Sequence, residues 1–264
     1  MKKTVKIVSL LLCLTLLLCA CGQNSVEDTT APAETAVTTE AALKTALEQG
    51  GRVELGADLA LSNEVVIRGQ MLDGGGYTLT GPVYNETDAT TQNGIAMVSG
   101  TVENVIIKGA FRCIGDTKAN GVAGDIRINN ITVDSEAYAL NFGYGSGMTN
   151  LYVTGSRLQG WSSYTKFMEA KFTDCTFAWN ESGTQGGFRP YINTTLSNCH
   201  FEGKTDESGA VVPFAIDFKS GSSNILLILE DCYVGDTLIT AENLYDLLSI
   251  NLEGNTIDIR NTVG

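Results

Sequence analysis

Apolar and polar residues alternate along the chain in short segments, and similar segments recur from about residue 105 onward. Each segment begins with two largely apolar residues that stand two positions apart. These pairs are Val105/Ile107, Ile131/Val133, Leu151/Val153, Ala170/Phe172, Thr194/Leu196, Leu227/Leu229 and Ile250/Leu252. Successive pairs begin 19 to 33 residues apart, which is typical of stacked structural repeats. Alternation at every second position predicts strands, because consecutive side chains of a strand point to opposite faces.

One position after each pair is expected to face the interior of the stack. It lies three residues beyond the second member of the pair and reads Ala110, Glu136, Ser156, Cys175, Cys199, Cys232 and Asn255. Like positions of neighbouring strands lie about 4.8 Å apart, so we expect Cys175, Cys199 and Cys232 to form a buried column. We interpret them as reduced core thiols, with disulfide bonds as the alternative. The residues just before these cysteines are interpreted as structural corner residues, namely Asp174, Asn198 and Asp231.

A short helical pattern precedes the first strands. Residues 39–51 read TEAALKTALEQGG, in which apolar residues fall at helical spacing. Thr38 or Thr39 is suited to the N-cap and Gly50 to the C-terminal stop. We expect this helix to cover the first coil, because the end of a strand stack otherwise exposes an unpaired edge and an apolar interior.

Repeats made of strands, with Gly and Asn at their corners and only four prolines in the chain, predict a parallel β-helix. Together with the stretches ALKTALEQGGRVELGADLAL and LDGGGYTLTG, this pattern resembles the pectate-lyase-like right-handed parallel β-helix superfamily over about residues 40–264. The resemblance implies an all-β fold, a single-stranded right-handed parallel β-helix with a short N-terminal capping helix. A fold of this kind does not imply one activity.

The N-terminus has the features of an export signal. Residues 1–20 combine three lysines with a short apolar core, which indicates a signal peptide. The stretch Leu18–Gly22 (LCACG) resembles a bacterial lipobox, and the resemblance implies lipidation of Cys21 and cleavage before it. We therefore expect a disordered tether at residues 21–38 and a β-helix domain at residues 39–264. The expected location is extracytoplasmic, lipid-anchored at the cell surface or the outer membrane.

Charge and composition narrow the range of partners. The formal net charge is −13, and loss of the three lysines in residues 1–20 makes the mature chain more acidic. Such a surface disfavours nucleic acid. The single histidine and the absence of a CxxC motif argue against a zinc site. No cofactor is expected, and calcium stays open although no dense aspartate cluster is apparent. We expect a monomer.

A second alternating segment lies upstream of each of these pairs. Its inward residues are expected to be Ile95, Met97, Leu140, Phe142, Phe167, Phe188, Ile216 and Phe218. The neighbours expected to point outward form the candidate ligand-binding face, namely Asn141, Lys166, Arg189, Tyr191, Asp217 and Lys219. Tyr144, Tyr191 and Trp161 are candidates for flat surfaces that contact sugar rings. Ordinary cross-strand pairing of Lys or Arg with Asp is the structural alternative.

The resemblance implies an activity on acidic polysaccharides, with Arg189, Asp217 and Lys219 as candidate catalytic residues. A glycosidase needs two carboxylates about 5–10 Å apart, and Glu169 with Asp217 is one candidate pair. However, Arg189-Pro190 lacks the second arginine that pectate lyases carry after such a proline. We therefore favour a non-catalytic protein that binds a glycan or another cell-surface component. A polysaccharide lyase or glycoside hydrolase is the first alternative, and a structural or adhesive spacer is the second.

Overall fold

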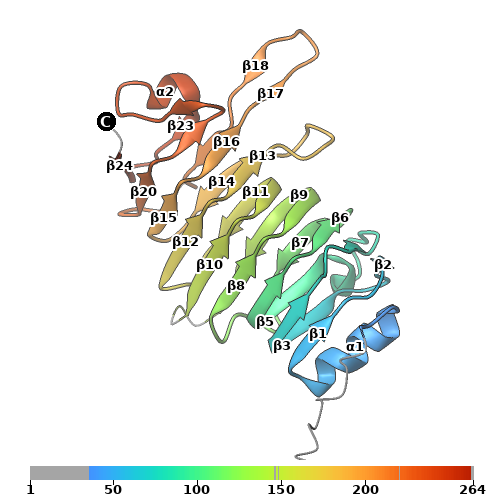
Figure 1. Ribbon diagram of the computed structural model, residues 1–264. Coiled ribbons are helices and arrows are strands. Elements are labelled where there is room, and N and C mark those ends of the chain that lie inside the picture. The colour runs from blue at the N-terminus through green and yellow to red at the C-terminus, as the bar shows by residue number, and fades with distance from the viewer. Residues whose placement is uncertain (1–35, 146, 148, 220, 263–264) are drawn as a thin grey trace, which may run out of the picture. The chain divides into compact units, whose positions relative to one another are not determined.

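The computed structural model describes residues 36–262 except residues 146, 148 and 220. This part of the chain is strand-rich, and its strands are largely parallel (Figure 1). Twenty-two of the described strands belong to one strongly curled sheet, and β17 (Lys204–Thr205) and β18 (Val211–Val212) form a separate antiparallel hairpin. The predicted all-β class and solenoid-like order are therefore confirmed. The expected signal peptide, Cys21 and most of the expected tether lie outside the described residues.

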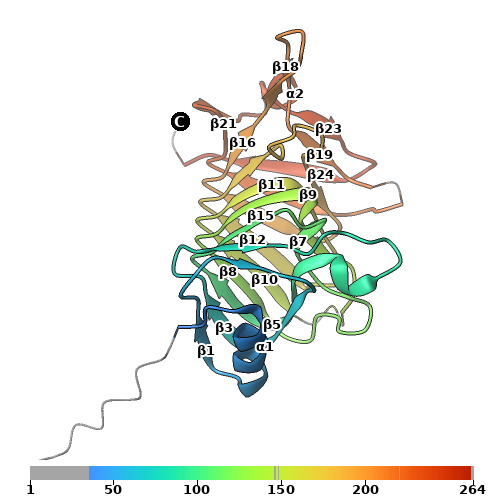
Figure 2. The same cartoon turned by 90° about the vertical axis from the view of Figure 1, so that its right-hand side faces the viewer.

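Within the curled sheet, the chain passes through three ladders of parallel strands in a fixed order and then returns to the first. In the first ladder Val102 pairs with Ile128. In the second Ile107 pairs with Val133, and in the third Ile95 pairs with Ile114. Each return places a new coil beside the previous one, as Figure 2 shows. The side chains between the ladders form one continuous apolar core.

Each ladder takes one short strand, or one end of a longer strand, from successive coils. The first ladder contains β1 (Arg52–Glu54), the end of β3 (Val65–Asp73), the end of β5 (Asn93–Glu103), β8 (Ile126–Asn129), β10 (Asn150–Thr154), β12 (Glu169–Thr173), β15 (Thr194–Ser197), β20 (Leu226–Glu230) and β24 (Thr256–Arg260). The second contains β2 (Leu59–Ala60), β4 (Thr78–Thr80), β6 (Ile106–Lys108), the start of β9 (Thr132–Phe142), the start of β11 (Arg157–Tyr164), β13 (Thr176–Ala178), β16 (His200–Glu202) and β21 (Tyr233–Val234). The third contains the starts of β3 and β5, β7 (Arg112–Gly115), the ends of β9 and β11, β14 (Gly187–Pro190), β19 (Ala215–Asp217) and β23 (Ser249–Asn251).

The register corrects the alignment of successive repeat pairs at two places. Leu151 and Val153 pair with Ile126 and Ile128, not with the pair that begins at Ile131. At the other end of the stack, Leu227 pairs with Ile257, not with a residue of Ile250/Leu252. The sequence pattern gave the wrong alignment because apolar residues at the corners continue the alternation from one strand into the next.

The buried column of cysteines is confirmed. Cys175, Cys199 and Cys232 lie just before the paired residues Thr176, His200 and Tyr233, and they are free, buried thiols. Hydrogen bonds between Cys199 and its two cysteine neighbours, together with burial, raise the pKa of its thiol far above the ordinary range. The hydrogen bond with Cys199 lowers the pKa of the Cys232 thiol. Because all three thiols are free and buried, they are core side chains, as predicted.

The column begins with different residues from those expected. Val105 and Ile131 lie at its N-terminal end, because Thr132 N–H donates to the Val105 carbonyl and Arg157 N–H to the Ile131 carbonyl. Ala110 and Glu136 are therefore not members, and Glu136 is exposed. Asn255 is not a member either, because it directly precedes β24, which belongs to the first ladder.

The corner between the first and second ladders repeats one backbone conformation. Its residues have a left-handed φ, at Asn104 (52°), Asn130 (49°), Asp174 (54°), Asn198 (52°) and Asp231 (49°). Asn and Asp tolerate this conformation better than other non-glycine residues. The Asn130 amide also donates to the Asn104 side chain on the preceding coil at 2.8 Å. The structural role predicted for the corner residues is thus confirmed.

The predicted capping helix is α1 (Glu40–Gln49), with Thr39 as N-cap and Gly50 as C-cap. Its own Leu43 and Leu47 are buried against the core. Val37, near the end of the expected tether, pairs with Leu55 just before the helix begins.

Three other elements complete the described structure, namely η1 (Ala89–Thr91), β22 (Thr237–Leu238) and the short helix α2 (Leu244–Leu247). Strand β22 pairs antiparallel with β21. Neither α-helix of the described residues is long and apolar enough to cross a membrane.

Candidate functional site

The outward side of the third ladder carries three of the predicted site residues. Asn141 pairs with Ser163, and Ser163 pairs with Arg189 on the following coil. Asp217 lies one coil further, bonded to Arg189. The residues before Asn141, Arg189 and Asp217 in the chain are buried, as predicted from the alternation, so these three side chains point out of the core.

Arg189 and Asp217 form an ion pair that a third residue extends. Arg189 Nε donates to Asp217 Oδ2 at 3.0 Å, and its Nη2 donates to the same oxygen. Asn251 Nδ2 donates to Asp217 Oδ1 at 3.0 Å. We call Arg189, Asp217 and Asn251 the charged cluster; it ties β14, β19 and β23 together. The sequence pattern did not reveal Asn251, because it assigned β23 to the wrong repeat position.

Trp161 lies beside this cluster on the preceding coil. The Arg189 guanidinium carbon is 4.4 Å from the centre of its ring, and Trp161 Nε1 donates to Gln185 Oε1 at 3.0 Å. Gly187 is the direct partner of Trp161 in the ladder. A Cβ at Gly187 would lie 2.3 Å from a carbon of the indole ring. Glycine is therefore required there for the ring to rest against the next coil.

Further aromatic side chains continue from Trp161 toward the N-terminal coils. Tyr138 is its direct ladder partner. Phe111 meets Tyr138 edge to face at 6.0 Å, and Tyr84 stacks on Phe111 at 4.3 Å between ring centres. All four side chains are partly exposed, and we call them the aromatic row. Arg112 lies 5.9 Å from the ring centres of both Phe111 and Tyr138.

The aromatic row has a signal in the sequence. Phe111, Tyr138 and Trp161 each stand at the start of a third-ladder segment, in FRCIG, YALNF and WSSY. In the third ladder Tyr138 pairs with Trp161, whereas Arg112 pairs with Tyr138 and Phe111 lies one residue before β7. Alignment of these segments would have placed Tyr138 and Trp161 in one outward column, with Phe111 next to it. Only Trp161 was among the predicted sugar-contacting residues, and it was predicted without its neighbours.

The other predicted site residues lie just after the third-ladder strands. Lys166 follows β11, Tyr191 follows β14 and Lys219 follows β19. Lys166 and Lys219 are exposed, and Tyr191 is partly exposed. Within the described part of the chain, none of the three is hydrogen-bonded to the charged cluster. Tyr144 occupies a similar place after β9 and is also exposed.

The candidate pair of carboxylates is not on one face. Glu169 lies in β12 of the first ladder, where it forms an ion pair with Lys171 at 3.1 Å, whereas Asp217 lies in the third ladder. Among the residues that the structure describes, no group of three or more His, Cys, Asp or Glu side chains is arranged to hold a metal ion.

Asp116, a buried acid near the outward side of the third ladder, has a structural role. The Asp116 carboxylate accepts hydrogen bonds from Gly143 N–H at 2.9 Å and from Tyr144 N–H at 2.7 Å. Burial raises the pKa of Asp116 despite these bonds. Its oxygens thus hold the turn of the next coil.

The arrangement offers flat apolar surfaces followed by a planar cation, a carboxylate and an amide. The flat apolar surfaces can contact the apolar face of a sugar ring. The cation, the carboxylate and the amide can form hydrogen bonds with hydroxyl groups of a ligand. No family model matches this chain, and no curated protein or solved structure matches it either.

Proposed function

We propose that this protein is a lipid-anchored, extracytoplasmic protein that binds a glycan along the third ladder without catalysis. One observation carries the proposal: the aromatic row leads directly to the charged cluster on consecutive coils. Side chains with an apolar body and a polar tip are typical of sites that must contact both faces and hydroxyls of a ligand. A ligand that runs across several coils would contact both groups.

We further infer that the strands close into a right-handed parallel β-helix. The regular passage through three ladders supports this, because it repeats one crossover connection between parallel strands in every coil. Such crossovers are right-handed in nearly all proteins. The resemblance of the sequence to the pectate-lyase-like superfamily agrees with this hand.

Charge favours a glycan with few carboxylates. Arg189 is already neutralised by Asp217, and both partners are only about a quarter exposed, at 24% and 26%. The chain as a whole is strongly acidic, so a polyanion would be repelled. The catalytic alternative would need Asp217 to act on a substrate, yet both of its oxygens already accept hydrogen bonds.

The anchor rests on residues outside the described structure. The basic start, the apolar stretch and the lipobox-like LCACG support export and lipidation of Cys21. Labelling of cells with a fatty-acid analogue tests this: the wild-type protein incorporates the label, and Cys21→Ser does not. Equal labelling of the variant would contradict the anchor.

The binding proposal is tested on a glycan array with the purified protein. Trp161→Ala should weaken binding about tenfold or more, because truncation of a central aromatic side chain often costs about 2 kcal/mol. Gly187→Ala should weaken it too, since the added methyl group displaces the indole ring. Gly143→Ala is the matched control, because a Cβ there meets nothing within 4 Å.

Three results would count against the proposal. Absence of glycan binding by the wild-type protein leaves the spacer hypothesis. Release of unsaturated or reducing-end products, abolished by Arg189→Ala, would support the enzyme. Equal binding by Trp161→Ala and the wild-type protein, with an unchanged fold, would place the glycan elsewhere.

A further inference from the structure

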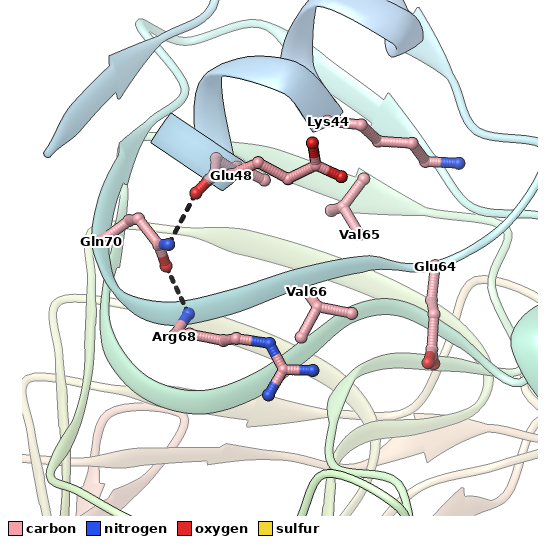
Figure 3. A pocket seen from close by; sticks show the side chains of 8 residues that line it. Lys44, Glu48, Glu64, Val65, Val66, Arg68 and Gln70 are labelled. Atoms are coloured by element: carbon pink, nitrogen blue, oxygen red, sulfur yellow. Dashed lines mark hydrogen bonds between the residues drawn. The ribbon is translucent and has the colours of Figure 1, made fainter. Parts of the chain in front are cut away.

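A cavity of about 440 Å³ lies at the N-terminal end of the third ladder, between α1 and the first half of β3 (Figure 3). It is lined by Lys44, Leu47, Glu48, Glu64, Val65, Val66, Arg68 and Gln70. A second cavity of about 520 Å³ also borders Glu64, and its remaining walls come from η1 and the segment 117–120. Both volumes are in the range of small-molecule sites.

Glu64 stands between the two cavities with an incomplete set of partners. Its Oε2 accepts a hydrogen bond from Asn93 Nδ2 at 2.6 Å. Burial raises the pKa of this half-buried carboxyl, and Arg112 and the Asn93 bond only partly offset that. In the described part of the chain Glu64 has no cation within salt-bridge distance. Asn93 is itself fully buried, and its Oδ1 has no hydrogen-bond partner there.

Arg68 is unusual among the arginines of this protein. Five of the seven arginines in the sequence form a salt bridge with a carboxylate, namely Arg52, Arg127, Arg157, Arg189 and Arg260. The two without one among the described residues are Arg68 and Arg112, and both lie near Glu64. The Arg68 guanidinium donates to the neutral side chain of Asn120, and its backbone N–H donates to Gln70 Oε1. Arg68 is exposed, and a guanidinium that forms no salt bridge within the protein can bind a carboxylate of a ligand in a bidentate way.

Glu64 and Arg68 point to the same side of the chain at the start of β3, which Glu64 directly precedes. Glu64, Val66 and Arg68 are alternate residues, so their side chains point the same way and the outer two Cα atoms are about 13 Å apart. Figure 3 shows Glu64, directly before β3, and Arg68 of β3 with Val66 between them. Long side chains at this spacing flank an apolar strip instead of meeting each other.

We propose that this cleft binds a small zwitterion of amino-acid size. Its carboxylate pairs with the Arg68 guanidinium in a bidentate way, and its ammonium group pairs with the Glu64 carboxylate. An apolar side chain of the ligand lies against Val66 and the methyl groups of Ala89 and Ala119. The site is independent of the glycan-binding face proposed above.

The first experiment is calorimetric titration of the full purified chain with the standard amino acids. Apolar ones such as leucine should bind. Two analogues with the same side chain separate the charges: isoamylamine lacks the carboxylate, and 4-methylpentanoate lacks the ammonium group. Each should bind at least about tenfold more weakly than leucine, which corresponds to about 1.4 kcal/mol. Failure of every amino acid to bind overturns the proposal, and so does equal binding of 4-methylpentanoate.

The second experiment assigns the site to these residues. Arg68→Gln and Glu64→Gln should each weaken leucine binding about tenfold or more. Arg127→Gln, at a similarly exposed arginine of the first ladder, is the matched control and should bind as the wild-type protein does. Trp161→Ala should also bind leucine normally, which separates this site from the glycan face. Normal binding by Arg68→Gln contradicts the proposal.

Discussion

The two ends of the third ladder differ in whether their charged side chains are paired with one another. Toward the C-terminus, Arg189, Asp217 and Asn251 lie on consecutive coils and are bonded to one another. At the N-terminal end, Arg68 lies on β3, the first strand of the ladder, and Glu64 directly precedes it. This strand is covered by α1 instead of another coil. Stacked coils place outward side chains about 4.8 Å apart, so charged side chains on neighbouring coils can form ion pairs. A helix does not align its side chains with those of the neighbouring strand in this way. In the described part of the chain, the Glu64 and Arg68 side chains beside α1 therefore form no ion pair with each other.

The interior differs between the same two ends. The core around the C-terminal coils is a cluster of rings in which Phe177 contacts Phe188 at 4.9 Å and Phe201 at 5.4 Å between ring centres. The core of the N-terminal coils is aliphatic, with residues such as Leu72 and Leu79. Aromatic pairs contribute about 0.5–1.5 kcal/mol beyond the area that they bury. The C-terminal coils should therefore depend more strongly on single side chains.

The largest expected effect on stability compares an aromatic and an aliphatic core residue in one inward column of the second ladder. Phe177 and Leu79 occupy the same inward position on different coils. Phe177→Ala should lower the free energy of unfolding by about 3–5 kcal/mol, and Leu79→Ala by about 2–4 kcal/mol. Urea denaturation measures both. A larger loss for Leu79→Ala would show that the aromatic cluster adds nothing to the C-terminal coils.

A smaller effect is expected in the cysteine column of the C-terminal coils. Cys199→Ser places a hydroxyl group between the thiols of Cys175 and Cys232, and a buried hydroxyl with poor partners costs about 1–3 kcal/mol. The measurement is again the free energy of unfolding. Thr195→Ser, at an outward position of β15, serves as the control. Equal stability of Cys199→Ser and the control would contradict a tightly packed column.

The smallest effect concerns Glu64 at the N-terminal end. Burial raises the pKa of Glu64, so the folded protein holds this proton more tightly than the unfolded chain does. The resulting stability is present below the ordinary value of 4.5 and is lost as the pH rises through the folded pKa. Glu64→Gln should therefore melt at a higher temperature than the wild-type protein at pH 7, and the difference should shrink toward pH 4.

Glu86→Gln, at an exposed site, is the control for this pH series. It should melt like the wild-type protein at pH 7. A wild-type protein that becomes more stable than Glu64→Gln as the pH rises would show that Glu64 is compensated by a cation, as Asp217 is. The contrast between the two ends of the ladder would then fail.

Several features could be predicted from the sequence because they depend on neighbours along the chain. Alternation at every second residue is a property of one strand, so it indicated the strands and the inward phenylalanines. The left-handed corners at Asp174 and Asn198 follow from residue type. The helix that begins after Thr39 follows from its cap and spacing. The cysteine column followed from a repeat that three coils share.

Other features were decided by the tertiary structure, because they depend on how coils align. Apolar corner residues such as Ile131 continue the alternation, so only the hydrogen-bonded register shows which residue begins a strand. That register brings Asn251 to Asp217 and Trp161 to Gly187. The cleft between Glu64 and Arg68 exists because α1 packs beside β3. Sequence alone determined the local pattern, whereas the lengths of the turns and the packing of the helix decided which distant side chains meet.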